Sequence, residues 1–269
     1  MGESLKIISE IGASFNDLTL DLENYDVDSA SLTMAKDSDY LYVGLYKKFR
    51  NLFIELDILT SASGISFEYY NGATWELLTV KDETRSLNRS GFLTWAPQED
   101  WAIADINGES LFYIRMTLDC TLDLSGINMI FSNDNDLKEK YRQIEQYLGN
   151  DDSFIAYHQS CRKDIIQDIR NSGETKVSSV DGYVEDLTVW DFLKPEQLRN
   201  ASAYLCLSKI FAGVSDNFDG KFYQLSKDYK KNYDSALETF LTTIDLDDDG
   251  EESDYEASES VKVSRLVML

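Results

Sequence analysis

The residues best suited to binding a metal lie near the C-terminal end of the chain, in the sequence DLDDDGEESDYE from 245 to 256. Their spacing matches the calcium-loop pattern D-x-D-x-D-G-x5-E, in which oxygen atoms at alternate positions surround the ion. The ligands would be the side chains of Asp245, Asp247, Asp249 and Glu256, together with the main-chain carbonyl of Glu251. No cofactor is required by any other motif, so Ca²⁺ is the one candidate cofactor.

An acidic linker in solvent is the alternative interpretation of the same residues. Six acids lie between Asp245 and Glu252 with no base among them, so they repel one another unless a divalent cation neutralises them. Glu252 occupies the eighth loop position, where EF-hands prefer an apolar residue, and the following residues are typical of a strand. We therefore expect no EF-hand pair, and both a single calcium-bound turn and a solvated linker stay open.

Residue types that commonly carry out catalysis are scarce. The single histidine, His158, falls on the apolar side of a predicted helix, where a hydrogen-bonded core position is much commoner than a catalytic one. Cys120, Cys161 and Cys206 are far apart and lack C-x-x-C spacing, which favours buried free thiols over a disulfide or a zinc site. Motifs for a serine nucleophile, a phosphate loop or a zinc protease do not occur. We expect a protein without catalytic residues that is not an enzyme.

Composition narrows the classes of partner. The chain has 269 residues, 43% of them hydrophobic, which is enough for folded cores. Its formal net charge of -24 repels nucleic acid and anionic membrane surfaces. No stretch approaches the ~20 consecutive apolar residues that span a bilayer, and the first residues do not resemble an export signal. We expect synthesis in a cytoplasm, with no sequence-specific nucleic-acid binding and no membrane association.

The first half of the chain has the pattern of β-strands. Between about residues 29 and 132, short runs of alternating apolar and polar residues are separated by polar turns, as in antiparallel sheets with one face toward a core. The runs are SASLTM, YLYVGLY, NLFIELDILT, GISFEYY, ATWELLTV, GFLTWA, SLFYIRMTL and INMIF. Asn71-Gly72 lies between two runs and predicts a tight hairpin, because both residues tolerate positive φ.

The second half has the pattern of helices, because apolar residues there recur at spacings of three and four. Asn133 to Asp136 supply capping residues for a first helix, whose stripe continues through Leu148. A second helix carries His158 on its stripe, and Pro195 suits the first turn of a third. A fourth helix has a tyrosine-rich stripe between residues 222 and 241.

These patterns predict an α+β multidomain protein. We expect a jelly-roll-like antiparallel β-sandwich over residues 1–132, a small α-helical bundle over 133–244, and an acidic turn with a C-terminal strand over 245–269. The last stretch alternates apolar and polar residues and then ends on LVML, which is poorly suited to water. We expect it to add as a strand to its own bundle or to a neighbouring subunit. The partner-binding residues would be Val261, Val263, Leu266, Val267 and Leu269.

Aromatic residues of the sandwich suggest a second kind of site. Aromatic faces stack on sugar rings, although core packing is the commoner use of aromatic residues in half-buried strands. The residues that would form such a platform are Trp75, Trp95, Trp101, Trp190, Tyr69, Tyr70 and Tyr113.

The β-rich half resembles β-sandwich modules of tailed-bacteriophage virion proteins. Those modules have a Y-x-N-G-x-x-W hairpin, then a D-x-T segment, an sG-x-l-x-w strand, a P-x-x-W turn and a YxIR strand. The resemblance covers residues 28 to 132. The matching positions are Tyr69 or Tyr70, Asn71, Gly72, Trp75, Asp82, Thr84, Gly91, Trp95, Pro97, Trp101, Tyr113 and Arg115.

The helical half is similar to the bundles of phage head-to-tail connector proteins, the adaptor or head-completion family that forms a ring below the portal. The similarity lies in WDFLKPEQLRNASAYLCLSKIFAGV, in the tyrosine-rich FYQLSKDYKKNYDSALETFL, and in an aspartate-rich turn before a terminal strand that ends near SRLVML. It rests on the order of these segments.

The resemblance implies a structural protein of the virion, assembled in the host cytoplasm. Its partners would be copies of itself in a homo-oligomeric ring, the portal, and other neck or tail proteins. A ring must pass DNA without gripping it, and an acidic lining would do so by repulsion. A calcium-dependent carbohydrate-binding protein, or a structural part of the tail or baseplate, is the alternative function.

Overall fold

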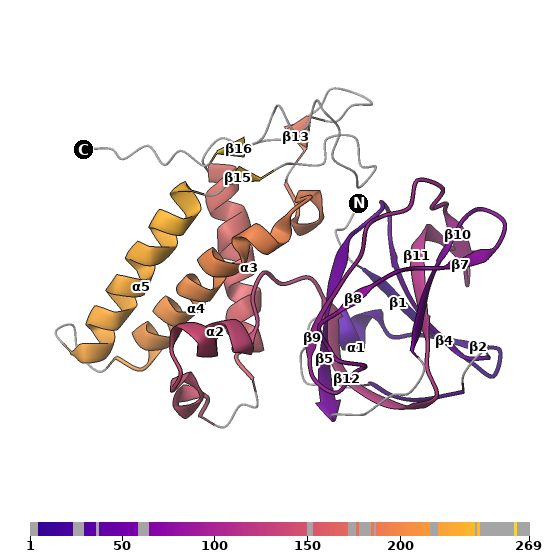
Figure 1. The fold of residues 1–269 in the computed structure, drawn as a ribbon, viewed down its shortest axis with the longest axis horizontal. Coiled ribbons are helices and arrows are strands. Elements are labelled where there is room, and N and C mark those ends of the chain that lie inside the picture. Colours follow the sequence, from indigo (N-terminus) through magenta and orange to yellow (C-terminus); the bar gives the residue numbers. More distant parts are fainter. Residues whose placement is uncertain are drawn as a thin grey trace. The chain divides into compact units, whose positions relative to one another are not determined.

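The computed structural model shows two compact units (Figure 1). The structure describes residues 5–23, 30–35, 38–58, 65–149, 153–171, 187–215 and 220–239, with four strand segments at 176–177, 184–185, 241–242 and 261–262. The first unit runs to Met129 and the second begins at Ile130. No helix among these described residues is long and apolar enough to cross a membrane.

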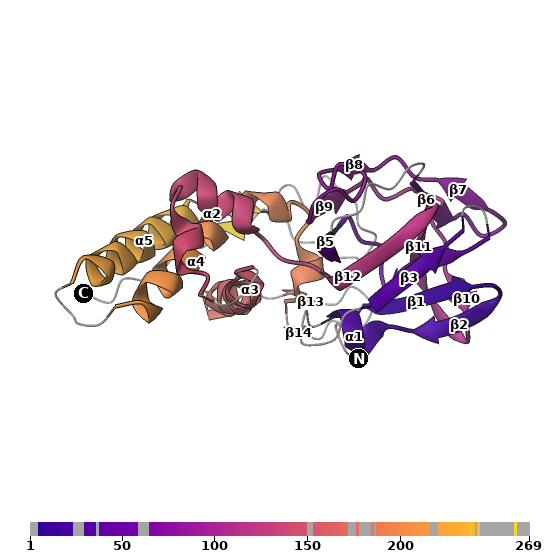
Figure 2. The ribbon, with the colours of Figure 1, turned by 90° about the horizontal axis from the view of Figure 1, so that it is seen from below.

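The first unit is an antiparallel β-sandwich of two sheets, as the sequence predicts (Figure 2). The seven-stranded sheet has the order β2-β1-β4-β11-β6-β7, with β10 paired to β11. Its strands are β1 (Lys6–Ile11), β2 (Ser14–Asp17), β4 (Tyr40–Leu45), β6 (Ser66–Tyr70), β7 (Trp75–Leu77), β10 (Ala104–Ile106) and β11 (Glu109–Thr117). The five-stranded sheet has the order β3-β12-β5-β9-β8. Its strands are β3 (Ala30–Met34), β5 (Asn51–Ile58), β8 (Lys81–Asp82), β9 (Gly91–Thr94) and β12 (Cys120–Asn128), and a short helix, α1 (Thr19–Glu23), packs on β12 and β1.

The two faces of the seven-stranded sheet carry different side chains. Val43 of β4 is paired with Ile7 and Ile114, which puts aliphatic side chains on one face. Tyr69 of β6 shares this face through its pairing with Ile114, and its ring contacts Trp101. The face therefore belongs to the buried core of the sandwich. The opposite face, which we call the aromatic face, has Tyr42 and Tyr113 at its centre and Tyr40, Tyr70 and Trp75 around them.

Several strands differ from the expected set. The strands β1, β2, β8 and β10 were not among the predicted runs, because they are short or mix polar residues into both faces. The last predicted strand, INMIF at residues 127–131, overlaps only the end of the observed strand, since β12 occupies residues 120–128. In β5 the residues from 51 to 56 are buried on both faces, so one-sided alternation does not describe that strand.

The hairpin at Asn71-Gly72 is present, but its loop is longer than a two-residue turn. Tyr70 pairs with Trp75, which leaves four residues in the loop. Within this four-residue loop only Gly72 has positive φ, at 93°. Asn71 acts through its side chain instead, accepting hydrogen bonds from the main-chain N–H groups of Ala73 and Thr74 at 2.9 and 2.8 Å.

The second unit is helical, as predicted. Its helices are α2 (Asp134–Lys140), α3 (Ile155–Asn171), α4 (Arg199–Gly213) and α5 (Lys221–Glu238), with 3-10 turns η1 (Ile144–Tyr147), η2 (Val189–Asp191) and η3 (Pro195–Leu198). Two short antiparallel pairs join β13 (Lys176–Val177) to β14 (Val184–Glu185) and β15 (Leu241–Thr242) to β16 (Val261–Lys262). The helix α4 packs against α2, α3 and α5, so it forms the centre of this unit.

Local sequence explains where most helices begin. Asn133 and Asp136 form a reciprocal capping box at the start of α2, which confirms the predicted cap. Pro195 begins η3, whose turn leads directly into α4. The first helix is shorter than expected, because Tyr141 is extended and the chain continues in η1. The stripe of α5 is also less buried than expected, since only Tyr233 and Leu237 are fully buried.

Gly44 offers a test of the aromatic face. The ring of Tyr113, which is fully buried, lies across Gly44 of β4 so closely that a methyl group would overlap it. We expect Gly44→Ala to destabilise the sandwich by ~1–3 kcal/mol through overpacking. Urea unfolding followed by tryptophan fluorescence measures this, since Trp75, Trp95 and Trp101 lie in the first unit. The same change in a Tyr113→Ala background should cost much less, and an equal cost would contradict the proposed overlap.

Candidate functional site

The predicted metal and partner-binding residues lie almost entirely outside the described residues. The set concerned is Asp245, Asp247, Asp249, Glu251, Glu256, Val263, Leu266, Val267 and Leu269. Val261 is the exception: with Lys262 it forms β16, which pairs antiparallel with Leu241–Thr242 of the same chain. Pairing within its own unit was one of the two arrangements expected for this strand. No group of three metal-binding side chains occurs in the part of the chain that the structure describes.

The aromatic face is the first of two clusters of polar and aromatic side chains in the described residues that could form a site. It is formed by the outer residues of the seven-stranded sheet, with a buried centre and partly buried aromatic and aliphatic residues around it. Its members are Ile8, Tyr40, Tyr42, Tyr70, Trp75, Ala104, Ile106, Leu111 and Tyr113. Cross-strand pairing puts them together, because Tyr42 is opposite both Ile8 and Arg115, and Glu68 is opposite Arg115.

Arg115 organises the polar part of this face. Its guanidinium group lies over the ring of Tyr40, 4.1 Å from the centroid, and over the ring of Trp75, 4.5 Å from the centroid. Its Nε donates to a carboxylate oxygen of Glu68 at 2.5 Å, with both side chains less than one quarter exposed. The cation is thus held by stacking and by a charge-assisted hydrogen bond together.

Tyr42 extends the network across the sheet. Its hydroxyl donates to a carboxylate oxygen of Glu10 at 2.7 Å. Burial and the Glu10 carboxylate raise the pKa of the Tyr42 phenol, while Arg115 opposes them, so the phenol remains protonated and keeps donating. Glu10, Tyr42, Arg115 and Glu68 therefore form a row across four neighbouring strands, with an accepting carboxylate at each end and the two donors between them.

Most of the aromatic residues expected for a sugar platform are unsuitable. Trp95, Trp101, Tyr69 and Tyr113 are at most 7% exposed, and Trp190 belongs to the helical unit, where it is also buried. Trp75 and Tyr70 remain, with ring centroids 5.5 Å apart and an interplanar angle of 50°. They are half-buried but not coplanar, and Arg115 already lies over Trp75. Five of the seven residues considered for a platform are therefore buried, which is the commoner use expected for them.

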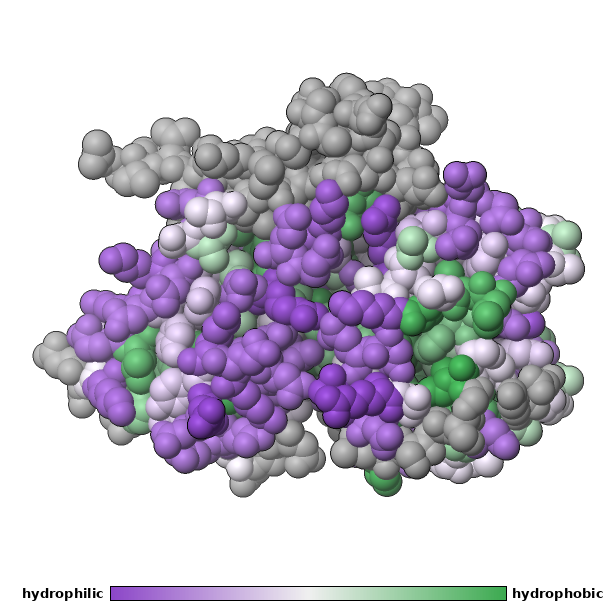
Figure 3. Space-filling view, in the orientation of Figure 1, coloured by the Kyte–Doolittle hydropathy of each residue, from purple (hydrophilic) through white to green (hydrophobic). Residues whose placement is uncertain are grey.

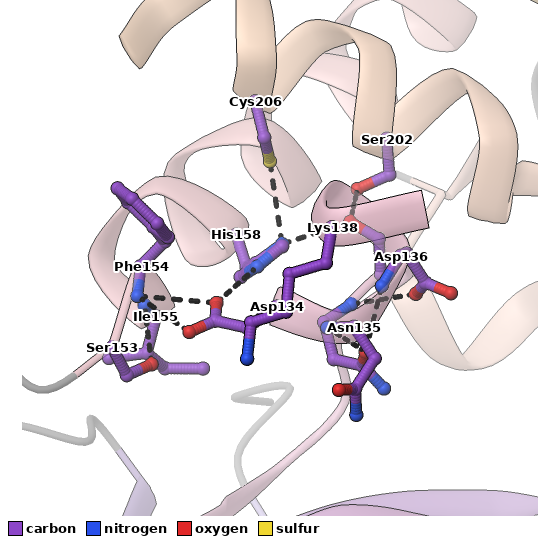
Figure 4. Close-up of polar contacts among 12 residues, drawn as sticks. Asp134, Asn135, Asp136, Lys138, Ser153, Phe154, Ile155, His158, Ser202 and Cys206 are labelled. Atoms are coloured by element: carbon purple, nitrogen blue, oxygen red, sulfur yellow. Dashed lines mark hydrogen bonds and ion pairs between the residues drawn. The ribbon is translucent and has the colours of Figure 1, made fainter. Parts of the chain in front are cut away.

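The second cluster surrounds His158 in the helical unit (Figure 4). His158 is 1% exposed, and its Nε2 lies 3.1 Å from a carboxylate oxygen of Asp134. Its Nδ1 lies 2.9 Å from Ser132 Oγ and 3.4 Å from Cys206 Sγ. Ser132 Oγ is also 2.7 Å from Ser202 Oγ. This network confirms that the histidine is a hydrogen-bonded core residue.

The chemistry of the partners indicates one tautomer. An ionised Asp134 only accepts hydrogen bonds, so His158 Nε2 carries the proton and donates it. Nδ1 is then an acceptor for the Ser132 hydroxyl, and Ser132 in turn accepts from Ser202. Asp134 also accepts from the main-chain N–H of Phe154 just before α3, at 3.2 and 3.3 Å for its two oxygens. One carboxylate thus ties the starts of α2 and α3 to a residue that faces α4.

The same three side-chain types occur in serine hydrolases, yet this arrangement does not support nucleophilic catalysis. A nucleophile must reach a substrate atom at roughly 3 Å, and the hydroxyl of Ser132 is fully buried. Its oxygen is also occupied by Ser202. A packing role, joining α2 and α3 to α4, is the function that the geometry supports.

The cysteines behave as core residues in this unit. Cys161 and Cys206 are fully buried and free, as expected, whereas Cys120 of β12 is half-buried and departs from that expectation. Burial and the neighbouring Cys161 raise the pKa of the Cys206 thiol well above its usual range. A protonated, buried thiol is a poor nucleophile, so Cys206 has no marked reactivity.

No family model and no curated protein matches the chain. Among solved structures, the chain named CpGH89CBM32-6, produced by Clostridium perfringens, is similar with 11% identity and a TM-score of 0.31, over 48% of this chain and 94% of that one. Two family 89 glycoside hydrolase structures from the same organism, one bound to GlcNAc-alpha-1,4-galactose and one to PUGNAc, have 11% identity and TM-scores of 0.30. Each match covers 63% of this chain and 20% of the glycoside hydrolase chain.

Arg115 should contribute to the stability of the sandwich through its stacked and paired geometry. We expect Arg115→Lys to cost ~1–2 kcal/mol, because lysine keeps the charge but loses the planar contact with two rings. Urea unfolding by tryptophan fluorescence is the measurement. Lys81→Met, at an exposed position of β8, serves as the matched control and should change little. If Arg115→Lys is as mild as the control, the stacking has no energetic role.

His158 should matter for the helical unit only. We expect His158→Ala to destabilise that unit by ~2–4 kcal/mol, because it leaves a cavity and removes the hydrogen-bond partner of two buried groups. Ser202→Ala removes one donor and should cost only about 1 kcal/mol. Far-ultraviolet circular dichroism follows the helices during unfolding, while tryptophan fluorescence mainly follows the sandwich. Equal shifts in both signals would contradict a role confined to the helical unit.

Proposed function

We propose that this chain is a structural protein of a tailed-phage virion, a subunit of a head-to-tail connector ring below the portal. The observation that carries the proposal is the order of elements in the second unit. WDFLKPEQLRN forms η2, η3 and the start of α4, the tyrosine-rich segment forms α5, and a short strand pair follows. This is the order in the connector family that the sequence resembles.

The sites found in the described residues fit the same proposal. The His158 network and the Arg115 cluster are both buried to a degree that suits packing, and neither presents a reactive group to a substrate. The surplus of acids on the whole chain suits a component that lies beside DNA without binding it.

A carbohydrate-binding role for the sandwich is the second candidate. One observation favours it: Trp75, Tyr70 and Tyr40 lie partly exposed on the aromatic face, beside Glu68 and Arg115. Aromatic rings with neighbouring charged groups are a common composition of sugar sites. Arg115 lies over two of these rings, so a sugar would have to use their remaining exposed edges or faces.

A conditional nonsense mutation in the gene for this chain tests the connector role. Without the chain we expect filled heads and separate tails, seen by negative-stain electron microscopy, because the ring that joins them is missing. Expression of the wild-type chain in the same host should restore joined particles and infectivity. The control for the genetic background is a phage with a nonsense mutation in an unrelated gene, grown in the same host without a suppressor.

Two other outcomes would contradict the connector proposal. Joined particles that fail to adsorb to their host would favour the carbohydrate-binding role, and Trp75→Ala should then reproduce the adsorption defect. Particles of normal appearance and normal infectivity would remove both roles.

A further inference from the structure

The seven-stranded sheet of the sandwich has two open edges. Its strand order ends at β2 on one side and at β7 on the other (Figure 2). All four residues of β2 are exposed, and so are two of the three residues of β7. A strand at the edge of a sheet carries main-chain N–H and C=O groups that point away from its one neighbour, and these groups can pair with another chain. Both edges could therefore accept a further strand.

The main-chain groups of β2 that point outward belong to Phe15 and Asp17. In an antiparallel ladder, hydrogen-bonded and non-hydrogen-bonded residue pairs alternate along the strands. Just beyond β2, the N–H of Leu18 donates to the carbonyl of Ile7 in β1 at 2.9 Å. By this alternation Asn16 is bonded to β1, while the residues on either side of it direct their N–H and C=O groups away from the sheet.

Trp75 and Leu77 are the corresponding residues of β7. The N–H of Leu78 donates to the carbonyl of Phe67 in β6 at 2.7 Å. The alternation then makes Glu76 a hydrogen-bonded partner of β6 and turns the main-chain groups of its two neighbours outward. Each edge thus presents two residues with free main-chain groups, separated by one residue that is bonded to the sheet.

The directions of the two edge strands also match. The path from β2 to β7 contains six strands, and every neighbouring pair along it is antiparallel, so β2 and β7 run in opposite directions. A second copy placed beside the first in the same orientation therefore brings its β2 antiparallel to β7, with the same face of the sheet continuing. Such a head-to-tail contact is heterologous, and it generates a ring when its rotation closes.

The exposed side chains at the two edges are complementary. The large hydrophobic side chains that are exposed among the described residues all belong to the first unit, and Figure 3 shows hydrophobic residues in green at its surface. Two of them lie on the aromatic face at its opposite edges: Phe15 is 40% exposed and Leu77 is 72% exposed. Pairing β7 with β2 of a second copy sets these two side chains opposite each other, so both become more buried.

Pairing of like edges is less favourable. In full overlap, two copies of β7 would set their Glu76 carboxylates opposite each other, and like charges in that position are destabilising. Two copies of β2 would set Asn16 opposite Asn16 and Phe15 opposite Asp17, which gives the phenylalanine no apolar partner. In the contact of β7 with β2, Leu77 and Phe15 pair on one face. The carboxylates of Glu76 and Asp17 are on opposite faces.

We propose that β2 of one copy of this chain adds to β7 of the next copy, with Phe15 opposite Leu77, so that the seven-stranded sheets of neighbouring copies join head to tail. The proposal rests on the ring-forming function above and identifies one contact of that ring. The contact spans only the three residues of β7, which is small for a protein interface, so free chains should associate weakly. Covalent trapping is therefore the suitable measurement.

Cysteine cross-linking tests the proposed register. Glu76 lies opposite Asn16 of the next copy in a non-hydrogen-bonded pair, whose Cα atoms are roughly 4.5 Å apart and thus within reach of a disulfide. Asn16→Cys and Glu76→Cys are made in separate full-length chains that also carry Cys120→Ser, because Cys120 is only half-buried. An equimolar mixture is oxidised with copper–phenanthroline, and the cross-linked dimer is quantified over time on non-reducing gels.

Two other mixtures are matched controls. Asn16→Cys with Leu77→Cys moves one cysteine by a single residue, to the other face of β7. Glu76→Cys with Ile58→Cys uses a position of the five-stranded sheet that is 59% exposed. We expect the mixture of Asn16→Cys and Glu76→Cys to cross-link at least tenfold faster than either control. A single chain that carries both changes should form a ladder of dimers, trimers and larger species.

A proline variant tests the main-chain contact itself. Leu77→Pro removes an N–H that points away from β6, so it leaves the ladder between β6 and β7 intact and blocks addition of a further strand. Added to the chain with Glu76→Cys, it should slow cross-linking to Asn16→Cys to the rate of the controls.

Three results would overturn the inference. Equal rates in all mixtures would show random collision. Faster cross-linking of Glu76→Cys alone, or of Asn16→Cys alone, than of their mixture would show pairing of like edges. A rate unchanged by Leu77→Pro would show that no strand is added at β7. None of these results depends on the nonsense-mutant phenotype, so a failure of this contact and a failure of the connector role are distinguishable.

Discussion

Burial of polar side chains together with their partners is the constraint on which both units depend. An unpaired buried polar group costs on the order of 1–3 kcal/mol, so such groups occur where several elements supply partners at once. His158 meets this condition through Asp134, the first residue of α2, and Ser132, which lies just before that helix. Arg115 meets it through Glu68 and two aromatic rings. Each network therefore holds together elements that are distant in the sequence.

The same constraint explains why two clusters of side chains with reactive or sugar-binding types have a structural role here. The side chains of Ser132, His158 and Asp134 are of the types found in a hydrolase triad, but the two histidine nitrogens face the opposite partners and burial removes access to a substrate. Likewise, the rings of Tyr40 and Trp75 have the types of a sugar site, and a cation of the chain itself lies over them. In both places the groups are satisfied by their neighbours within the chain.

Aromatic rings pack differently in the two units. On the sandwich, Arg115 lies over Tyr40 and Trp75 and is paired with Glu68. In the helical unit, Phe222 and Tyr229 stack on Phe211 and so join α5 to α4.

Periodicity alone determined the class of each half and most helix positions, since alternation and three-to-four spacing follow directly from strand and helix geometry. Caps such as Asn133 and Asp136 were also readable, because capping is a local interaction. Tertiary structure decided the rest. It brought Arg115 over Trp75, joined His158 to Asp134, and buried Trp95 and Trp101, which composition alone could not distinguish from exposed aromatic residues. Such contacts depend on strand order and helix packing, and these are set by the whole chain rather than by any one segment.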